Sequence, residues 1–233
     1  MLKADLHIHT SKDPEDRRYI RLSPKEIITI AAKKKFDVIS ITHHSHVYFN
    51  EELKNFAKKQ GILLIPGCEH RIDGKDILIY NITEKERRKI KTFKDLNKIR
   101  NKALVIAPHP YYFGIHSLGR ELCKNINLFD AIEYSHFYTR WFNPNKKAIK
   151  IAIKHNKPLI GTSDTHYLFQ FGTTYTLIDA KKNIKSVFKA IKENKIVVKS
   201  KPLSPHVFLI LIARMIFTLP KKLFQIISFK HEF

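Results

Sequence analysis

The sequence predicts an α/β protein, and three observations support this prediction. Strand-like and helix-like segments alternate along residues 1 to about 200, as they do in proteins with mostly parallel strands. Apolar residues make up 43% of the 233 residues, enough to bury a sizeable core and too many for a disordered chain. Histidines and acids come directly after the predicted strands, which favours a (β/α) barrel with one site at the strand ends.

The first half of the chain opens with a predicted strand at residues 2–8. Ser23, Pro24 and Glu26 then supply an N-cap, a first-turn proline and a capping-box acid, which together predict the start of a helix. Gly61 marks the end of a second helix. The elements expected after the first strand are a helix at 22–35, a strand at 37–42, a helix at 51–60 and strands at 62–67 and 77–82.

The second half continues the alternation with less regular spacing. Pro144 lies near the first turn of a predicted helix, where its missing N–H and fixed φ are favourable. The expected elements are a basic helix at about 92–101, strands at 103–108 and 130–135, a helix at 144–156 and a strand at 158–163.

The first strand carries its polar residues on one face. Side chains alternate along a strand, so Asp5, His7 and His9 share one face while Leu6 and Ile8 share the other. A single strand histidine is more often a hydrogen-bonded structural residue. Two histidines and an acid on one face suit coordination of a transition metal, and we expect the apolar pair to lie in the core.

The remaining histidines and acids follow later strands. They are His43, His44 and His46, then Glu69, then His109, then His136, then Asp164 with His166. The C-terminal ends of parallel strands converge on one face of a barrel, where active sites are built. The pattern therefore predicts that these side chains meet in one site.

The motifs "DLHIHT", "ITHHSH", "GCE", "APHP" and "GTSDTH" occur in a characteristic order. In order and approximate spacing, residues 1 to about 200 resemble the four-motif signature of the PHP (polymerase and histidinol phosphatase) family. The resemblance implies a distorted (β/α)7 barrel with two or three divalent metal ions, zinc, manganese or iron, at the strand ends. It also implies a hydrolase that cleaves phosphate esters with metal-activated water.

The resemblance also implies a set of metal ligands. The first ion would be held by His7, His9, Glu69 and Asp164, the second by Glu69 and His109, and the third by His44, His166 and an acid of the loop after the first motif. Asp13 is the expected loop acid, and Asp16 is the alternative. Glu69 would therefore bridge two ions.

Three positions depart from the family pattern. His43 stands where an acid or amide is usual, so we expect it to support its neighbour through a different hydrogen bond or to shift the metal preference. Asp76 stands near a position where many members have a histidine, so the second ion would gain an oxygen ligand or bind more weakly. His136 replaces an asparagine or another polar residue, and both a site contact and a structural role stay open.

The chemistry suggests further roles. Asp164 can act as both ligand and proton shuttle, and His43 or His136 can protonate the leaving group. Arg71 and Arg140 are candidate phosphate donors, although each can equally be a surface arginine.

Aromatic residues and net charge indicate the substrate class. Tyr138 is a candidate for stacking on a nucleobase, together with Tyr111, Tyr112, Phe137, Trp141 and Phe142. The formal charge of +22 favours partners that carry phosphate or lie on anionic lipid, although solvated lysines alone would also produce it. A nucleotide or short oligonucleotide is therefore the preferred substrate, with another phosphorylated metabolite as the alternative and nucleic acid as a possible partner.

Two other functions remain open. A barrel of this family recurs in a protein component of ribonuclease P, so a non-catalytic RNA-binding subunit is one alternative, although such a module needs no metal ligands. Amide hydrolysis uses the same activated water and is the other.

The C-terminal tail differs from the rest, and we expect a barrel at 1–202 followed by a hydrophobic and basic tail at 203–233. The apolar run from Val207 to Leu219 is shorter than the ~20 residues that cross a bilayer, so a docking helix is predicted, with a membrane-surface helix as the alternative. Cys68 and Cys123 lack disulfide or metal spacing, which favours a reducing, cytoplasmic location.

Overall fold

The computed structural model describes residues 1–214. The chain divides into two compact units. The larger unit comprises residues 1–136 and 144–201, and the smaller comprises residues 137–143 and the segment that begins at Pro202.

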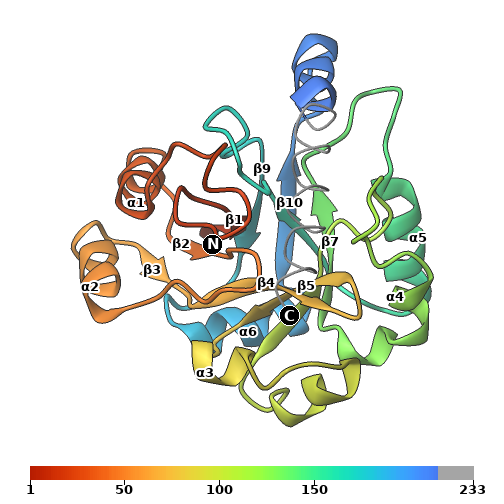
Figure 1. The fold of residues 1–233 in the computed structure, drawn as a ribbon, viewed down its shortest axis with the longest axis horizontal. Coiled ribbons are helices and arrows are strands. Elements are labelled where there is room, and N and C mark those ends of the chain that lie inside the picture. The colour runs from red at the N-terminus through yellow and green to blue at the C-terminus, as the bar shows by residue number, and fades with distance from the viewer. Residues whose placement is uncertain (215–233) are drawn as a thin grey trace, which may run out of the picture. The chain divides into compact units, whose positions relative to one another are not determined.

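The larger unit contains both sheets. Its strands are β1 (Leu2–Ile8), β2 (Val38–Ile41), β3 (Leu63–Leu64), β4 (Gly67–Ile72), β5 (Lys75–Tyr80), β6 (Leu104–Ala107), β7 (Ala131–Ser135), β8 (Leu159–Thr162), β9 (Thr174–Ile178) and β10 (Ile196–Ser200). Its helices are α1 (Pro24–Lys33), α2 (Glu51–Lys59), α3 (Glu84–Arg87), α4 (Arg120–Lys124), α5 (Asn145–Lys154) and α6 (Ile184–Lys192), with short 3-10 helices at Phe93–Lys98 and Ile126–Leu128. In Figure 1, α1 and α2 lie beside β2 and β3, and α4 and α5 lie on the side of β7.

The strands form two five-stranded sheets, in the orders β10-β9-β1-β2-β3 and β4-β5-β6-β7-β8. Parallel pairing links β1 to β2, β2 to β3, β6 to β7 and β7 to β8. The other pairs are antiparallel, so both sheets are mixed. The prediction of a distorted (β/α)7 barrel is therefore wrong, because the strands of residues 1–214 form two separate sheets and no closed barrel.

A hairpin between β4 and β5 explains part of this difference. Asp73 and Gly74 have φ values of +50° and +75°, and the flanking strands pair from Gly67 opposite Tyr80 to Ile72 opposite Lys75. Asp-Gly is a strong hairpin signal, whereas a parallel connection needs a dozen or more residues. β5 therefore returns antiparallel and interrupts the alternation that a barrel requires.

Three of the four predicted helices are confirmed, as α1, α2 and α5, and one prediction is wrong. Ser23 caps α1 by accepting the N–H of Glu26, whose carboxylate accepts the Ser23 N–H, and Pro24 opens the helix as predicted. The helix expected at 92–101 is instead a short 3-10 helix in which only Leu96 is buried. Phe93, Leu96 and Ile99 contact one apolar cluster at a spacing of three residues, which suits the three-residue turn of a 3-10 helix.

The alternation along β1 is confirmed. Leu6 and Ile8 are buried in apolar clusters, where Ile8 packs with residues of α1 and β2. Asp5, His7 and His9 are also fully buried, but on the other face of the strand. Their burial requires polar partners, which the site supplies.

The smaller unit joins a loop to the chain after β10. The backbone N–H of Leu203 donates to the carbonyl of Tyr138 at 2.8 Å, and the ring of Phe208 lies 4.9 Å from that of Phe137. Residues 205–214 are helical. No helix within residues 1–214 is long and apolar enough to cross a bilayer, and the run from Val207 to Leu219 extends outside the described residues.

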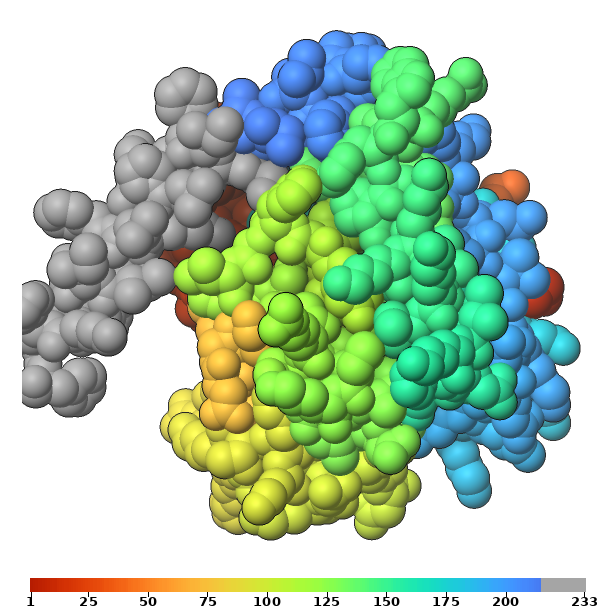
Figure 2. Space-filling model, turned by 90° about the vertical axis from the view of Figure 1, so that its right-hand side faces the viewer, coloured from red at the N-terminus to blue at the C-terminus, as the bar shows by residue number. Residues whose placement is uncertain are grey.

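A cavity of about 420 Å³ lies near the N-terminal end of β8. Its lining is Ala152, Ile153, Asn156, Lys157, Leu159, Asn194, Ile196 and Val198. Figure 2 shows this side of the larger unit, with α5 beside the segment that contains β10. The lining contains no carboxylate or histidine, so this cavity lacks the side chains that usually bind a metal ion.

Candidate metal centre

Two backbone bridges connect the two sheets where the predicted ligands meet. One pairs Ile8 with Thr165, and the other pairs His44 with Glu69. The N–H of His9 donates to the carbonyl of Thr165 at 2.9 Å, and the N–H of Glu69 donates to the carbonyl of His43 at 3.1 Å. These bonds hold four segments that are distant in sequence around one point.

The prediction that each ligand follows a parallel strand is correct for most segments. His44 follows β2, His109 follows β6 and Asp164 follows β8. Glu69 is different, because it is the third residue of β4, whose partner β5 is antiparallel.

Four donor atoms surround the first candidate position. His7 Nε2 and His9 Nε2 lie 3.1 Å apart. Glu69 Oε2 and Asp164 Oδ1 each lie 3.4 Å from both of these nitrogens. Ligands about 2.0–2.1 Å from a tetrahedral ion lie roughly 3.3–3.4 Å from one another. The spacing and chemistry of His7, His9 and Glu69, whose donor atoms lie within 4.8 Å of one another, therefore fit a divalent metal ion, and Asp164 lies beside both histidines.

Asp164 supplies a second sign of this fit. Its Oδ1 is buried and has no hydrogen-bond partner, a costly state that a cation at the centre would relieve. Its φ is +44°, and that of His109 is +25°, values that side-chain-bearing residues seldom adopt. Such backbone strain tends to occur where a site requires a particular side-chain position.

A second donor group shares Glu69. Its Oε1 lies 2.9 Å from His109 Nε2, whereas its Oε2 faces the first group, so one carboxylate spans both positions. Asp76 completes a trio with Glu69 and His109 whose donor atoms lie within 4.8 Å of one another. Asp76 therefore offers oxygen near the position where the family pattern has a histidine, and its Oδ1 also accepts from Arg71 Nε at 2.9 Å.

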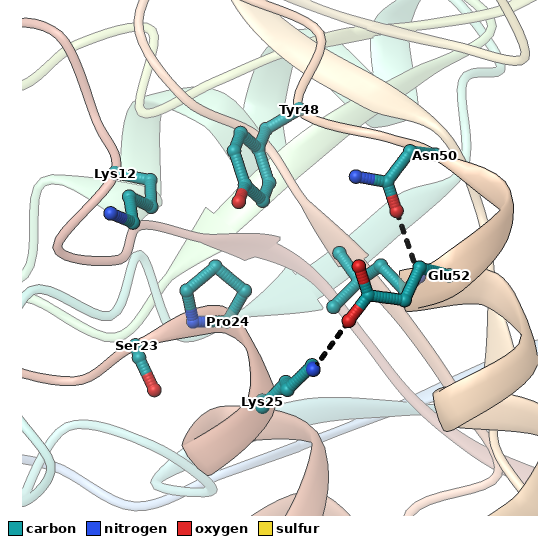
Figure 3. A pocket seen from close by; sticks show the side chains of 8 residues that line it. Lys12, Ser23, Pro24, Lys25, Tyr48, Asn50 and Glu52 are labelled. Carbon is teal, nitrogen blue, oxygen red and sulfur yellow. Dashed lines mark hydrogen bonds and ion pairs between the residues drawn. The ribbon is translucent and has the colours of Figure 1, made fainter.

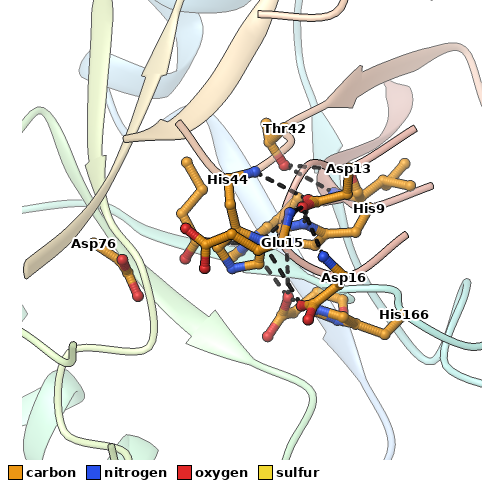
Figure 4. A network of polar contacts seen from close by, with 12 residues as sticks. His9, Asp13, Glu15, Asp16, Thr42, His44, Asp76 and His166 are labelled. Carbon is orange, nitrogen blue, oxygen red and sulfur yellow. Dashed lines mark hydrogen bonds and ion pairs between the residues drawn. The ribbon is translucent and has the colours of Figure 1, made fainter. Parts of the chain in front are cut away.

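A third group comprises His9, His44 and His166, whose nitrogens also lie within 4.8 Å of one another. Figure 4 shows Asp13 and Asp16 beside these three histidines. The oxygens of Asp13 accept from His9 Nδ1 at 2.7 Å, from the backbone N–H and Nδ1 of His44 at 3.0 Å, and from two backbone N–H groups of its own loop. Asp16 Oδ2 lies 3.1 Å from His166 Nε2. Asp13 thus orients two histidines, and the choice between Asp13 and Asp16 as ligand stays a prediction.

The ionised carboxylates of the site favour positive charge on the neighbouring histidines. Burial opposes protonation of His44 and His109, but the carboxylates of Asp13 and Glu69 raise the pKa of each to about 9. Burial also opposes ionisation of Glu69 and Asp164, yet the charge of His7 holds both carboxyl pKa values well below their usual range. Ionised acids among protonated histidines are groups that a divalent cation can bind in place of protons.

The two candidate proton donors are deeply buried. His43 Nε2 pairs with Thr10 Oγ1 at 2.7 Å, and burial lowers the His43 pKa to about 3. His136 Nε2 lies 2.9 Å from Gln170 Nε2, and burial lowers its pKa to about 4. Both are neutral imidazoles at pH 7, and their catalytic roles stay predictions.

The candidate substrate-binding residues lie in different parts of the molecule. Arg71 lies in β4 beside the second donor group and is paired with Asp76 and Glu15. Arg140 and Tyr138 belong to the smaller unit, where Arg140 is exposed and Tyr138 is buried. Their roles in binding stay predictions.

Sequence reasoning missed Glu133 as a site residue. This acid lies within the otherwise apolar start of β7 and is fully buried beside His7, with Glu133 Oε1 2.8 Å from His7 Nδ1. A charged residue in a buried strand needs a partner, and this was the available signal.

A separate surface cavity of about 240 Å³ adjoins the ligand loop. Its lining is Lys12, Ser23, Pro24, Lys25, Tyr48, Asn50, Glu52 and Leu53. Figure 3 shows Lys12 and Tyr48 on one side and the ion pair of Lys25 with Glu52 on another. Lys12 directly precedes Asp13, so this cavity offers cationic groups close to the metal centre in sequence.

Comparisons with known proteins identify relatives of this chain. Residues 142–196 match a family described as PHP-associated. This match supports the resemblance of the chain to the PHP family. Two uncharacterized proteins of Methanocaldococcus jannaschii are similar to this chain. One is 29% identical over 66% of this chain and 92% of its own length, and the other is 26% identical over 75% and 69%.

Solved structures share the fold of this chain at low sequence identity. PsfC from Pseudomonas syringae superposes with a TM-score of 0.60 at 14% identity, covering 94% of this chain and 98% of PsfC. A Bifidobacterium adolescentis protein, provisionally named a metal-dependent phosphoesterase, gives 0.53 at 14% identity, covering 70% and 87%. An amidohydrolase from Chromobacterium violaceum gives 0.51 at 15% identity, covering 70% and 87%.

Proposed function

We propose that this protein is a metal-dependent hydrolase that cleaves phosphate esters, with two or three divalent ions of zinc, manganese or iron. The observation that carries the proposal is the first donor group, in which Glu69 Oε2 and Asp164 Oδ1 each lie 3.4 Å from the Nε2 atoms of His7 and His9, and Asp164 Oδ1 lacks a hydrogen bond. Such a set of donors is costly to bury without a cation. The likeness to a named phosphoesterase supports the reaction class.

The residues around the ions have distinct tasks in this proposal. When bound, divalent ions lower the pKa of bound water and neutralise phosphoryl oxygens. Glu69 keeps the two donor groups together through its two oxygens. Asp164, with a side chain 21% exposed, is the ligand that can reach both the centre and the solvent and can carry a proton away.

A nucleotide or short oligonucleotide is the proposed substrate. The net charge of +22 favours a polyanionic ligand. Tyr111 and Tyr112 follow His109 and lie on the same loop as the exposed Phe113, which offers aromatic rings for base stacking beside the second donor group. Arg71, partly exposed next to that group, is the proposed donor to the phosphate.

Elemental analysis of the purified protein, paired with hydrolysis assays, tests this function. We expect two or more transition-metal equivalents and hydrolysis of an aryl phosphate and of nucleotides that chelation abolishes and added metal restores. Asp164→Asn should lower kcat by roughly 10²–10⁴-fold, the range typical of a positioned proton-transfer group. Protein that binds manganese, zinc or iron but hydrolyses none of these esters would contradict the proposal.

Amide hydrolysis is the second candidate, because a neighbour of the same fold is named an amidohydrolase. That structure contains sulfate, a tetrahedral anion that resembles phosphate in shape, and this favours the phosphate ester. A panel of cyclic amides assayed beside the phosphate esters separates the two reactions. The nearly complete set of metal donors argues against a purely RNA-binding subunit.

A further inference from the structure

Glu133 is a buried carboxylate that contacts two histidines of the metal centre. It lies in β7, is 0% exposed, and belongs to none of the sequence motifs that predicted ligands. Its Oε1 lies 2.8 Å from His7 Nδ1 and also accepts the hydroxyl of Thr162. Its Oε2 accepts the backbone N–H of His109 at 2.5 Å. One carboxylate therefore reaches a histidine of the first donor group and a histidine of the second.

These contacts determine how His7 can act. Because Glu133 accepts from Nδ1, that nitrogen carries the proton, and Nε2 is left to face Glu69 and Asp164 at 3.4 Å each. Glu133 itself already accepts from three donors, and its partner nitrogen on His7 points away from the first donor group. Glu133, His7 and His109 also offer donor atoms within 4.8 Å of one another, but because the oxygens of Glu133 are already engaged it is better placed to orient ligands than to bind an ion.

The bond to His109 acts on the backbone. His109 has a φ of +25°, a conformation that side-chain-bearing residues rarely adopt, and its N–H is held by Glu133 Oε2. The ring of His109 then places Nε2 2.9 Å from Glu69 Oε1. A short charge-assisted bond at this point offsets the strain of the backbone.

We propose that Glu133 is a positioning residue that sets the ring of His7 and the backbone of His109, and so couples the geometry of the two donor groups joined by Glu69. The inference rests on the metal centre of the proposed function and assigns the acid on which its alignment depends. A carboxylate is required, because only a carboxylate accepts on both oxygens.

An amide in the same place cannot meet both demands. In Glu133→Gln, an amide oxygen facing His7 puts the NH2 group against the N–H of His109. The reverse orientation puts NH2 against His7 Nδ1, which favours a proton on Nε2, where the ion should bind. Either orientation disturbs one of the two histidines.

Cobalt(II) binding to the full chain tests this inference. Affinity is measured by competition with a chelator, and the visible spectrum reports the ligand geometry. We expect Glu133→Gln to bind cobalt roughly 10–100-fold more weakly, with an altered spectrum, as is typical when a partner of a ligand histidine is lost. Asp130→Asn is the matched control, because Asp130 is a buried acid just before β7 that bonds to Val105 and Arg100 and to no predicted ligand.

The outcomes separate the Glu133 role from the proposed function. Equal cobalt affinity in wild type and Glu133→Gln, or equal losses in Glu133→Gln and Asp130→Asn, overturns the role of Glu133. Wild-type protein that binds cobalt without hydrolysing esters contradicts the phosphoesterase proposal alone.

A second measurement keeps the inference testable if Glu133→Gln does not fold. NMR of the zinc-loaded, nitrogen-15-labelled wild type should show a proton on His7 Nδ1, shifted downfield and protected from exchange. Thr162→Val, which leaves the Glu133 carboxylate in place, should keep that proton. Zinc-loaded protein with no proton on His7 Nδ1 overturns the inference.

Discussion

The metal centre and the surface cavity beside it use the same kinds of charged groups in opposite settings. In the centre, His7, His9 and Glu69 have side chains at most 2% exposed, and carboxylates direct the histidines. In the cavity, Lys25 and Glu52 form an ion pair whose side chains are 53% and 74% exposed.

The comparison teaches that burial decides what a polar contact contributes. A buried donor or acceptor that loses its partner incurs its full desolvation cost, whereas an exposed pair regains water. Substitutions in the centre should therefore change metal binding strongly, and substitutions in the cavity wall should change it little.

Glu69→Gln should have the largest effect on metal binding at the buried centre. One amide cannot serve as an anionic ligand to both donor groups, so we expect loss of bound metal and a fall in activity larger than the roughly 10–100-fold that follows loss of an orienting residue. Metal content and kcat/KM measure this. Glu15→Gln is the matched control, since Glu15 is a partly exposed acid that pairs with Arg71. Full metal content in Glu69→Gln would be incompatible with a bridging role.

Asp13→Asn should have the next largest effect. The amide loses one of the acceptors that orient His9 and His44, so the affinity for metal should fall roughly 10–100-fold while some metal remains bound. Isothermal titration calorimetry with zinc measures this affinity for Asp13→Asn and, in parallel, for Asp16→Asn. If Asp16 is the ligand, Asp16→Asn should remove one metal equivalent, whereas Asp13→Asn should weaken binding without changing the number of sites. The reverse result would make Asp13 the ligand.

Arg71→Gln tests a residue of intermediate burial, because the Arg71 side chain is 24% exposed and pairs with Asp76. If Arg71 donates to phosphate, KM should rise about tenfold or more, since a hydrogen bond to a charged group contributes about 1.5–3 kcal/mol. Steady-state kinetics on a nucleotide substrate measure it. Arg71→Lys keeps the charge without the planar fork and should recover part of the loss. An unchanged KM in Arg71→Gln would leave Arg71 as a structural partner of Asp76 and Glu15.

Lys25→Ala should have the smallest effect. Its ion pair with Glu52 is exposed, so metal content, activity and melting temperature should stay at wild-type values. A large rise in KM with unchanged stability would instead show that the cavity binds part of the substrate.

Sequence reasoning succeeded where the signal was local. The capping residues Ser23 and Glu26 make the bonds predicted for them, and β1 buries Leu6 and Ile8 on one face and His7 on the other. These features depend on residues within a few positions of one another, so the sequence contains nearly all the information.

It failed where pairing between distant strands decided the outcome. The Asp73–Gly74 turn reverses the chain, and β9 pairs antiparallel with both β1 and β10, so the strands form two mixed sheets. An alternation of strands and helices does not reveal which strands will be neighbours, because that depends on packing of the whole chain.

The sequence by itself determined which residues are available as metal donors and that most of them follow strands. Only the tertiary structure decided their arrangement: Glu69 between two groups, Asp13 on two histidines, and Glu133 behind His7 and His109. The physical reason is that ligand identity is a property of single residues, whereas the direction of each donor atom depends on hydrogen bonds between strands distant in sequence.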